Sequence, residues 1–434
     1  MRYQIVLPLL MSALTAIGQE AWTVERCMKF AVEHNHEVNI QALQLDNLRA
    51  DRVRAVGAFL PSVGASIGGQ YNFGRAIDPE TNTYTNVNTF YNGYQMYAAL
   101  PVFDGFNRLH ALRAAKASVL MGQSALRQQQ DETALAVLQA YTNALYYQGT
   151  IAMAKEKVEE TALLLKQTKL LEEVGRKSAA DVAQVESQAA EAEYHLTQQQ
   201  NLYESASLEL KKAMAWPLAS DLVIDSDVPA FPSTGKEDYS LSPLHASLEA
   251  SRLQADVARH EWHQARSALY PSISLNLGMS TTYYKTLRSS TATPFSEQFR
   301  NNRGEYIGAT LSIPLFNRLQ SVSGIRRARN NYRIACETYK EKQLELEKLS
   351  REAWQDWHAY RTQTAQMVHK VEADSIAYQL TKRQFEEGLS TAIDLRSTSA
   401  QLLQSKATLL QCRLMAMVKE TLVKYYKGAQ IWTE

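Results

Sequence analysis

The sequence has little cysteine and few long apolar runs, and each shortage narrows what the protein can be. Its 434 residues include only three cysteines, Cys27, Cys336 and Cys412, which lie far apart within helical sequence. Such a set is a poor disulfide framework, so we expect small core residues instead. Beyond the first residues, no stretch reaches the roughly 20 apolar residues that a transmembrane helix needs. If this chain crosses a membrane, it must do so with β-strands.

An excess of charge of one sign is also missing. The formal net charge of +1 gives no support for nucleic-acid binding, which usually needs a basic face. No Ser-His-Asp order, phosphate-binding loop or CxxC motif occurs, so we expect neither an enzyme nor a cofactor. His260 and His263 lack the i,i+4 spacing of zinc-binding helices. They are expected to be solvated, and no metal site is predicted.

The first 18 residues have the features of a secretory signal peptide. Arg2 supplies the positive start and Ile5 to Leu14 forms the apolar segment. Ala16-Ile17-Gly18 is a small-x-small cleavage site before Gln19. The mature protein is therefore expected to leave the cytoplasm.

The chain consists of two copies of one unit, with a period of about 210 residues. Phe59-Leu60-Pro61-Ser62-Val63 returns as Leu269-Tyr270-Pro271-Ser272-Ile273, and Leu100-Pro101-Val102-Phe103 returns as Ile313-Pro314-Leu315-Phe316. The first copy is predicted at residues 19–216 and the second at 242–434. The proline-containing segment 217–241 is predicted to be the linker.

Each copy is predicted to contain a helix, two strands, a very long helix and a return helix. The predicted ranges in the first copy are Val24 to Val56, 62–73, 91–102, 107–172 and 179–216. Those in the second copy are Pro243 to Leu269, 272–284, 304–315, 319–386 and 391–427. Polar loops, Gly74 to Phe90 and Lys285 to Arg303, are expected to link the strands of each pair.

The strands suggest a barrel shared between chains. Val63, Ala65 and Ile67 alternate with small or polar residues, which places the two sets on opposite faces of a sheet. Each strand is long enough to cross a bilayer at a tilt. Four strands cannot close a barrel, and an open edge in lipid leaves backbone groups unpaired. Two chains would give eight strands and a filled interior, whereas three give twelve and an aqueous lumen.

These elements define a fold class that is mostly α with membrane β. We expect a trimeric, twelve-stranded β-barrel with four strands per chain, continued by a long α-helical coiled-coil barrel. Each long helix could reach ~100 Å at 1.5 Å per residue. Leu112, Val119 and Leu126 recur at the seven-residue interval of a supercoiling seam.

The order of these elements resembles the TolC family of outer-membrane efflux proteins. The likeness includes Trp22-Thr23-Val24-Glu25-Arg26-Cys27 and the two turn–helix segments, Glu173 to Gln188 and Glu387 to Gln401. The resemblance implies a homotrimer in the outer membrane of a Gram-negative-type envelope, in contact with outer-membrane lipid and with its helical part in the periplasm. It also implies a periplasmic adaptor protein and an inner-membrane transporter as partners. The implied function is the exit duct of a tripartite efflux or type I secretion system.

The resemblance also assigns the adaptor contact. The turns between the long and return helices form the family's periplasmic tip, so Gly175, Arg176, Gly388 and Leu389 are contact candidates. A plainer reading is that the two glycines only end their helices with a positive φ.

A constriction is implied beside these turns. Asp394 and its equivalent Asp181 would each form a ring of three carboxylates in a trimer, which attracts cations. Phe385 occupies the position of an aromatic gate residue, while Ser397 stands in place of the family's second aspartate. The plainer reading of both aspartates is a first-turn residue favoured by the helix dipole.

Two other functions remain open at this point. A periplasmic adaptor or coiled-coil envelope assembly protein would also carry helical hairpins. A secreted helical rod would share the long helices but would be found in the medium.

Overall fold

The structure is a computed structural model that describes residues 21–78, 82–86, 88–226, 241–287 and 293–432. The expected signal peptide and residues 227–240 of the expected linker lie outside these ranges. The chain divides into two compact units, each built from both sequence copies. Unit 1 contains Met1–Ile40, Arg127–His245 and Glu345–Glu434, and unit 2 contains Gln41–Leu126 and Ala246–Leu344.

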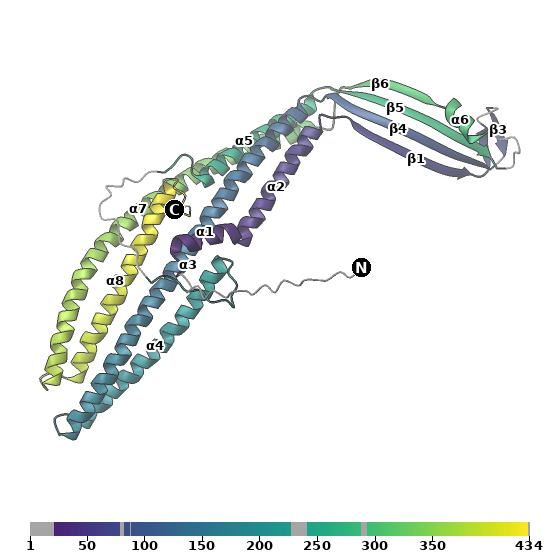
Figure 1. The fold of residues 1–434 in the computed structure, drawn as a ribbon. Coiled ribbons are helices and arrows are strands. Elements are labelled where there is room, and N and C mark those ends of the chain that lie inside the picture. Colours follow the sequence, from purple (N-terminus) through teal and green to yellow (C-terminus); the bar gives the residue numbers. More distant parts are fainter. Residues whose placement is uncertain (1–20, 79–81, 87, 227–240, 288–292, 433–434) are drawn as a thin grey trace, which may run out of the picture. The chain divides into compact units, whose positions relative to one another are not determined.

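The residue bounds of the helices labelled in Figure 1 repeat from the first copy to the second. The equivalent helix pairs are α2 (His36–Gly57) with α5 (Ala246–Arg266), α3 (Asn107–Glu173) with α7 (Gln320–Glu386), and α4 (Ala179–Ala213) with α8 (Ala392–Tyr426). From α3 to α7 the start moves from 107 to 320 and the end from 173 to 386, a spacing of 213 residues at both ends. The α4–α8 pair keeps the same spacing. From α2 to α5 the start moves from 36 to 246, a spacing of 210.

The first helix is not continuous, contrary to the prediction of one helix over Val24 to Val56. It breaks at Asn35 into α1 (Val24–His34) and α2. Asn35 is extended, with φ −63° and ψ 135°. Its side-chain oxygen accepts a hydrogen bond from the Glu37 N–H at 2.7 Å, and its amide donates to the Ala213 carbonyl at 3.0 Å. The asparagine therefore caps the second helix while ending the first. Thr23 caps α1, since its side chain accepts a hydrogen bond from the Arg26 N–H at 3.4 Å.

Four strands form one antiparallel sheet in the order β1-β4-β5-β6. They are β1 (Ser62–Asn72), β4 (Thr89–Phe103), β5 (Ser272–Thr286) and β6 (Gly304–Ser312). Both outer strands, β1 and β6, have one edge that pairs with no strand among the described residues. One face carries the apolar row Val63–Ala98–Leu277–Ile307. The other face carries the row Gly64–Tyr97–Gly278–Tyr306, in which each tyrosine ring lies against its opposite glycine.

The sequence analysis expected simple polar loops between the strands of each pair, but both segments contain regular structure. The first contains a hairpin, β2 (Arg75–Asp78) and β3 (Thr83–Asn86), in which the Arg75 guanidinium lies 5.1 Å from the centre of the Tyr84 ring. The second contains α6 (Phe295–Asn301). Because β6 pairs with β5 only as far as Ser280, the rest of that β5 edge needs other partners. Gln298 of α6 supplies them by bonding both the N–H and the carbonyl of Tyr284 at 2.9 Å.

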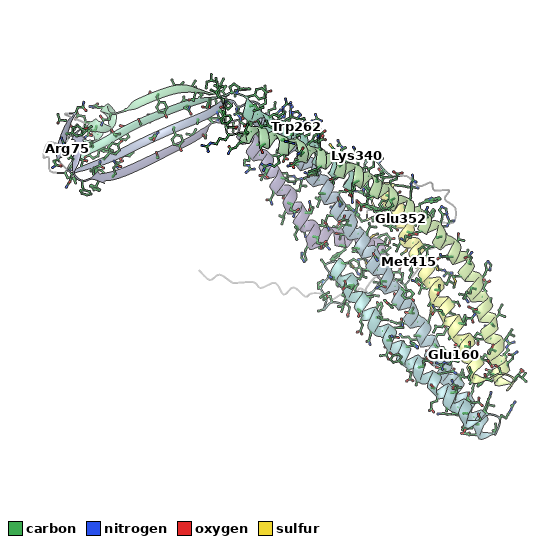
Figure 2. All side chains as sticks on the ribbon, turned by 180° about the vertical axis from the view of Figure 1, so that it is seen from behind. Arg75, Glu160, Trp262, Lys340, Glu352 and Met415 are labelled. Atoms are coloured by element: carbon green, nitrogen blue, oxygen red, sulfur yellow. The ribbon has the colours of Figure 1, made fainter. Side chains whose placement is uncertain are left out.

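The helices of unit 2 follow the order of the strands that they join. A Cβ atom on Gly122 of α3 would lie 2.7 Å from the Leu48 side chain, so α2 and α3 are in close contact. Asn107 of α3 donates to the Ser267 hydroxyl, just after α5, at 3.0 Å. The ring of Trp262 of α5, which is labelled in Figure 2, stacks on the ring of Tyr332 of α7 with the ring centres 5.9 Å apart. The order α2-α3-α5-α7 leaves α2 and α7 as the outer helices.

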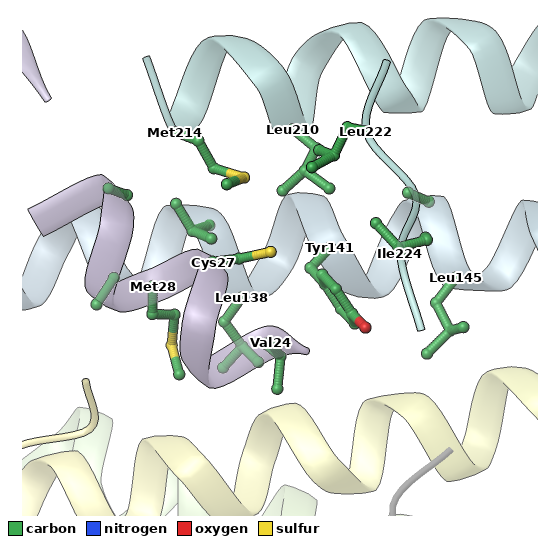
Figure 3. Packing of buried hydrophobic residues seen from close by; sticks show 14 of the residues in the cluster. Val24, Cys27, Met28, Leu138, Tyr141, Leu145, Leu210, Met214, Leu222 and Ile224 are labelled. Carbon is green, nitrogen blue, oxygen red and sulfur yellow. The ribbon is translucent and has the colours of Figure 1, made fainter. Parts of the chain in front are cut away.

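The main core of unit 1 surrounds α1 (Figure 3). Val24, Cys27 and Met28 of α1 are buried against Leu138 of α3 and Leu210 of α4. Leu222 and Ile224 of the expected linker complete this cluster, and Ile224 forms a β-bridge with Trp22. Burial raises the pKa of the Cys27 thiol to about 12, which makes it an unreactive core residue at neutral pH. None of the described helices is both long and apolar enough to span a membrane.

Candidate functional site at the helical turns

Two turns of the same construction join the long helices to the return helices in unit 1. Gly175 follows α3 with φ +74°, and Gly388 follows α7 with φ +81°. The Arg176 N–H bonds the Leu171 carbonyl, and the Leu389 N–H bonds the Gln384 carbonyl, both at 2.8 Å. This is the bonding of a Schellman motif, whose left-handed position favours glycine. The predicted glycine caps are therefore present in both turns.

Asp181 and Asp394 cap the helices that leave these turns. Asp181 accepts from the Ser178 N–H at 3.1 Å, and Asp394 accepts from the Thr391 N–H at 3.1 Å. In return, the Ser178 and Thr391 side chains accept from the two aspartate N–H groups, which completes a capping box at each helix start. The hydroxyl bond from Ser178 lowers the pKa of Asp181, and that from Thr391 lowers the pKa of Asp394. Both carboxyls are thus ionised at neutral pH. Each also has the simpler role expected of it, that of an acidic residue in the first turn of a helix.

Asp394 remains accessible beyond its cap. The cap uses its Oδ2 atom, and Asp394 is exposed. Ser397 lies three residues further along α8 and is also exposed. The i,i+3 spacing places the two side chains on the same side of the helix. The carboxylate ring predicted for Asp394 and Asp181 remains a prediction.

Phe385 lies in a small core above the turns. Its side chain is fully buried with Leu164 of α3, Val185 of α4 and Leu395 of α8. The Lys177 ammonium, from the first turn, lies 3.7 Å from the centre of its ring. This aromatic position therefore joins the α3–α4 hairpin to the α7–α8 hairpin. Its predicted gate role remains a prediction.

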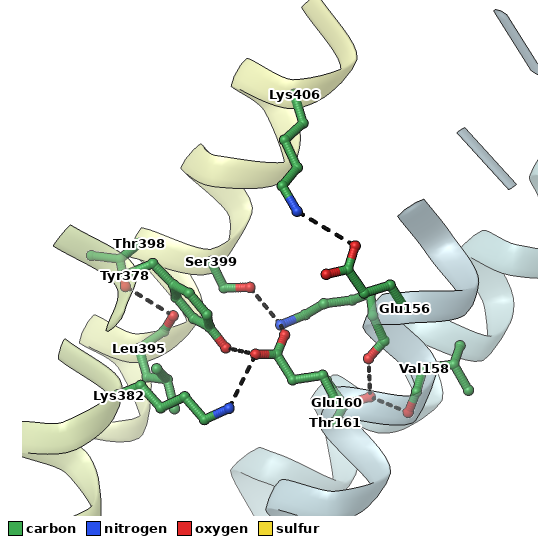
Figure 4. Close-up of polar contacts among 11 residues, drawn as sticks. Glu156, Val158, Glu160, Thr161, Tyr378, Lys382, Leu395, Thr398, Ser399 and Lys406 are labelled. Carbon is green, nitrogen blue, oxygen red and sulfur yellow. Dashed lines mark hydrogen bonds and ion pairs between the residues drawn. The ribbon is translucent and has the colours of Figure 1, made fainter. Parts of the chain in front are cut away.

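A half-buried polar cluster, which the sequence analysis did not predict, lies next to that core (Figure 4). Glu160 of α3 accepts a hydrogen bond from the Tyr378 hydroxyl of α7. Its carboxylate also meets the ammonium groups of Lys157 at 3.0 Å and Lys382 at 3.4 Å. Lys157 in turn donates to the Ser399 hydroxyl of α8. The i,i+3 spacing of Lys157 and Glu160 and the i,i+4 spacing of Tyr378 and Lys382 are visible in the sequence, but neither identifies the contact between α3 and α7.

Further polar contacts connect the same hairpins. Arg396 of α8 pairs with Glu191 of α4 at 2.8 Å, and Lys406 of α8 pairs with Glu156 of α3 at 3.4 Å. Gln188 of α4 donates to the Ala392 carbonyl at 3.3 Å. The two hairpins are therefore joined by several polar links around one apolar core.

The turns also present apolar side chains to solvent. Val174, Leu389 and Ile393 are all exposed, and they come from both turns. Arg176 of the first turn is exposed as well. Exposed apolar groups with a neighbouring charge are typical of a surface that binds another protein.

The histidines of α5 are only partly exposed, whereas the sequence analysis expected solvated side chains. His263 stacks on His110 of α3 at 5.1 Å, and His260 lies 6.2 Å from the same ring. Burial, followed by nearby positive groups, lowers the pKa of all three imidazoles. Among the described residues, no group of three or more His, Cys, Asp or Glu side chains is arranged to hold a metal ion.

The comparisons with known proteins place the chain in the outer membrane, with its helical part in the periplasm. A family model described as outer membrane efflux protein matches residues 28–215 and 243–420, and the chain belongs to this family. The family consists of channel proteins rather than enzymes.

Three known proteins illustrate the similarity. The alkaline protease secretion protein AprF of Pseudomonas aeruginosa is 25% identical over 332 residues, covering 73% of this chain and 66% of AprF, just under two thirds. The probable efflux pump outer membrane protein TtgC of Pseudomonas putida is 22% identical over 437 residues, covering 96% of this chain and 86% of TtgC. The solved structure of VceC from Vibrio cholerae shares the fold with a TM-score of 0.81 at 14% identity, covering 94% of this chain and 96% of VceC.

Proposed function

We propose that this chain is the exit duct of a tripartite efflux or type I secretion system and acts as a homotrimer. Three copies would combine their four-stranded sheets into one twelve-stranded barrel in the outer membrane. The helical part would continue the lumen through the periplasm toward an adaptor protein and an inner-membrane transporter. Cargo would pass through without a chemical step.

The observation that carries this proposal is the open-edged sheet with one apolar face. In lipid, the unpaired backbone groups of β1 and β6 would each cost several kcal/mol. The row Val63–Ala98–Leu277–Ile307 presents apolar side chains from all four strands to the same side. An outward apolar face and a small or polar inner face are what a membrane barrel requires.

The turns would serve as the periplasmic entrance. In a trimer, Asp394 would contribute three ionised carboxylates to one ring, with Asp181 in a second set. Such rings favour cations over anions in a water-filled pore. Ser397 would widen the ring where the family has a second aspartate, and Phe385 would keep the two hairpins together.

The exposed turn residues would form the adaptor contact. Leu389 and Arg176 come from equivalent turns, so three chains would present six such turns around the entrance. Gly175 and Gly388 fix the backbone on which these side chains are displayed.

The first experiment tests the duct itself. The protein is extracted from outer membranes in mild detergent, its mass is measured by light scattering, and its conductance is recorded in planar bilayers. We expect the mass of three chains and stable cation-preferring channels. A monomer without conductance would overturn the proposal.

The second experiment tests the entrance. Asp394→Asn removes the charge but keeps an oxygen for the cap, whereas Asp394→Ala removes both. Both variants should lower the cation preference, seen as a reversal potential closer to zero under a salt gradient. If both variants keep the wild-type reversal potential, the gate assignment is wrong.

The adaptor contact has a separate test. Leu389→Asp should abolish export in the native host while leaving trimer mass and bilayer conductance unchanged. Leu244→Asp, an exposed leucine in unit 1 away from the turns, is the matched control. Equal export by both variants would exclude Leu389 from the contact.

A further inference from the structure

Charge is unevenly distributed between the two compact units. Unit 2 contains 21 lysine and arginine residues against 12 aspartate and glutamate residues, and unit 1 contains 25 against 33. The near-neutral chain thus combines a unit of formal charge +9 with a unit of formal charge −8. Such an asymmetry within one chain indicates that the basic unit has a partner of opposite charge.

The excess lies where the long helices begin below the sheet. No aspartate or glutamate occurs between Asp104 and Asp131, or between Glu305 and Glu337, although these two segments contain nine lysine or arginine residues. The first segment leads from β4 into α3, and the second leads from β6 into α7. Both copies of the duplicated unit therefore carry the basic feature at the same place.

Three arginines meet on one face of the α3–α5 pair. Arg259 and Arg266 of α5 are two helical turns apart, and His263 lies between them on the same side. The rings of His263 and His110 of α3 stack with their centres 5.1 Å apart, and Arg113 lies one turn further along α3. After burial, these three guanidinium groups are what lowers the pKa of His263, which places all of them near one imidazole.

Helix α7 extends this basic face. The Arg266 guanidinium lies 5.9 Å from the centre of the Trp262 ring, and that ring stacks on Tyr332 of α7. Arg329 precedes Tyr332 by three residues, on the same side of the helix. At the spacing of 213 residues, the basic positions of α3 return as basic positions of α7. We call the six exposed cations the basic band: Arg113, Lys116, Arg259, Arg266, Arg326 and Arg329.

The basic band has no counter-charge within the chain. None of its six cations forms an ion pair with a residue that the structure describes. The neighbouring carboxylates of Glu249 and Asp256 both pair with Arg252, at 2.6 and 3.4 Å. Asp104 pairs with Arg108 at 2.9 Å. Exposed cations that repel one another in this way are stabilised by an external anion.

Aromatic side chains indicate where the bilayer surface lies relative to the band. All four junctions between a helix and a strand of the sheet present an aromatic residue that is between 40% and 79% exposed: Phe59, Phe106, Tyr270 and Phe316. Aromatic residues concentrate at the boundary between membrane and water, and barrels carry a girdle of them at each interface. With the helical part in the periplasm, these junctions mark the periplasmic surface of the bilayer.

The basic band begins within reach of that surface. Arg266 is the last residue of α5, and Arg113 and Arg326 each lie six residues into their helices, or ~9 Å at 1.5 Å per residue. The polar headgroup layer is roughly 5–7 Å thick on each side of a bilayer. Long cationic side chains extend toward such a layer, and their attraction acts over a Debye length of about 8–10 Å.

We propose that the basic band binds the headgroups of anionic phospholipids in the periplasmic leaflet of the outer membrane. The guanidinium groups would donate paired hydrogen bonds to headgroup phosphates, and Lys116 would act as a point charge. The band would thereby fix the depth of the barrel in the membrane. This inference rests on the proposed placement of the sheet in the bilayer and adds the class of lipid that the helical part contacts.

Native mass spectrometry can measure the lipid preference. The purified protein in mild detergent is mixed with equal amounts of phosphatidylglycerol, which is anionic, and phosphatidylcholine, which has no net charge. The number of molecules of each lipid that the complex retains is then counted. A band variant neutralises three arginines of the α3–α5 face: Arg113→Gln, Arg259→Gln and Arg266→Gln. A control variant removes the same charge from exposed positions of unit 1: Lys155→Gln, Lys166→Gln and Arg413→Gln.

We expect the wild-type protein to retain more phosphatidylglycerol than phosphatidylcholine. Each cation near an anionic surface changes binding roughly fivefold, so the loss of three should remove the preference in the band variant. The control variant should keep it. Replacing the same three arginines by lysine, as Arg113→Lys, Arg259→Lys and Arg266→Lys, should also keep it, because the charge remains. Raising the salt concentration should reduce the wild-type preference.

Three outcomes would overturn the headgroup site. The first is equal retention of the two lipids by the wild-type protein, and the second is an equal loss of preference in the band and control variants. The third is a band variant that keeps the lipid preference but shows a changed reversal potential in planar bilayers, because the band would then face the lumen and act on passing anions.

The proposed duct fails by different measurements. A wild-type trimer that conducts but shows no lipid preference would leave the duct intact and remove the headgroup site. A monomer that does not conduct, yet loses its phosphatidylglycerol preference only in the band variant, would overturn the duct and keep the site.

Discussion

The hydroxyl of Tyr378 on α7 donates a hydrogen bond to the carboxylate of Glu160 on α3, 218 residues earlier in the chain. Burial opposes ionisation of this carboxyl. The Tyr378 bond and the ammonium groups of Lys157 and Lys382 outweigh that effect, so the pKa of Glu160 is lowered. The two hairpins are thus held together by an ionised carboxylate in a half-buried position.

Tyr378→Phe should weaken this link without changing the packing of the ring. A hydrogen bond to a charged group contributes about 1.5–3 kcal/mol, so we expect a clear loss of thermal stability in the detergent-extracted protein. Tyr194→Phe, on an exposed tyrosine of α4, should change little. Equal stability of the two variants would show that the hydroxyl bond does not stabilise the fold.

The Glu160 cluster should also give a pH dependence of defined sign. Its pKa is lowered in the folded state from an ordinary value of 4.5. The stabilisation is therefore present above that value and is lost as the pH falls through the lowered pKa. Glu160→Gln should be less stable than wild type at neutral pH, with a smaller stability change on acidification. If acidification lowers the melting temperature of wild type and of Glu160→Gln by the same amount, this prediction is wrong.

Regular patterns allowed much of the fold to be predicted from the sequence. Period-two alternation located the strands near Ile67 and Leu277, and uninterrupted sequence located the long helices. The break at Asn35 was missed because its cause is a distant carbonyl, that of Ala213. The helix α6 was missed because it is short and compensates for the early end of β6, which is a property of the whole sheet.

The site was predictable only where its chemistry is local. The turns at Gly175 and Gly388 depend on neighbouring residues, as do the caps made by Asp181 and Asp394. Glu160 could not be found in this way, since two of its partners, Tyr378 and Lys382, come from another helix far along the chain. Solvated histidines were expected because the sequence does not show that α3 places His110 against His263.

The histidine cluster predicts a second pH effect, in unit 2. The pKa values of His110, His260 and His263 are lowered from 6.5, so the unfolded chain binds protons first as pH falls. The stability that the neutral rings contribute is complete above that value and is lost below it. Thermal unfolding at about pH 7.5 and about pH 5.5 should show a smaller acid-induced loss for His110→Gln than for wild type.

The exposed His195 of α4 provides the control for that measurement. His195→Gln should keep the wild-type loss on acidification. If His110→Gln and His195→Gln behave alike, the cluster does not set the acid sensitivity.

At Gly388 the cost of a strained backbone can be measured without any change in side-chain packing. Its φ is +81°, and a Cβ atom added there would meet nothing within 4 Å. Gly388→Ala should therefore lower stability only through the left-handed backbone, by about 1–2 kcal/mol. Gly388→Asn should cost less, because asparagine tolerates this conformation better. If Gly388→Ala melts at the same temperature as Gly388→Asn or higher, the backbone at this position is not left-handed.

Asn35 gives a matched test of the break between α1 and α2. Asn35→Ala removes the cap on the Glu37 N–H and the bond to the Ala213 carbonyl, so stability should fall by about 0.5–2 kcal/mol. Asn39→Ala, one turn later on an exposed position of α2, removes a side chain that makes no such cap. It should leave stability close to wild type or raise it slightly, because alanine favours helix. Denaturant unfolding of both variants measures the difference, and a greater loss for Asn39→Ala would show that Asn35 does not fix the break.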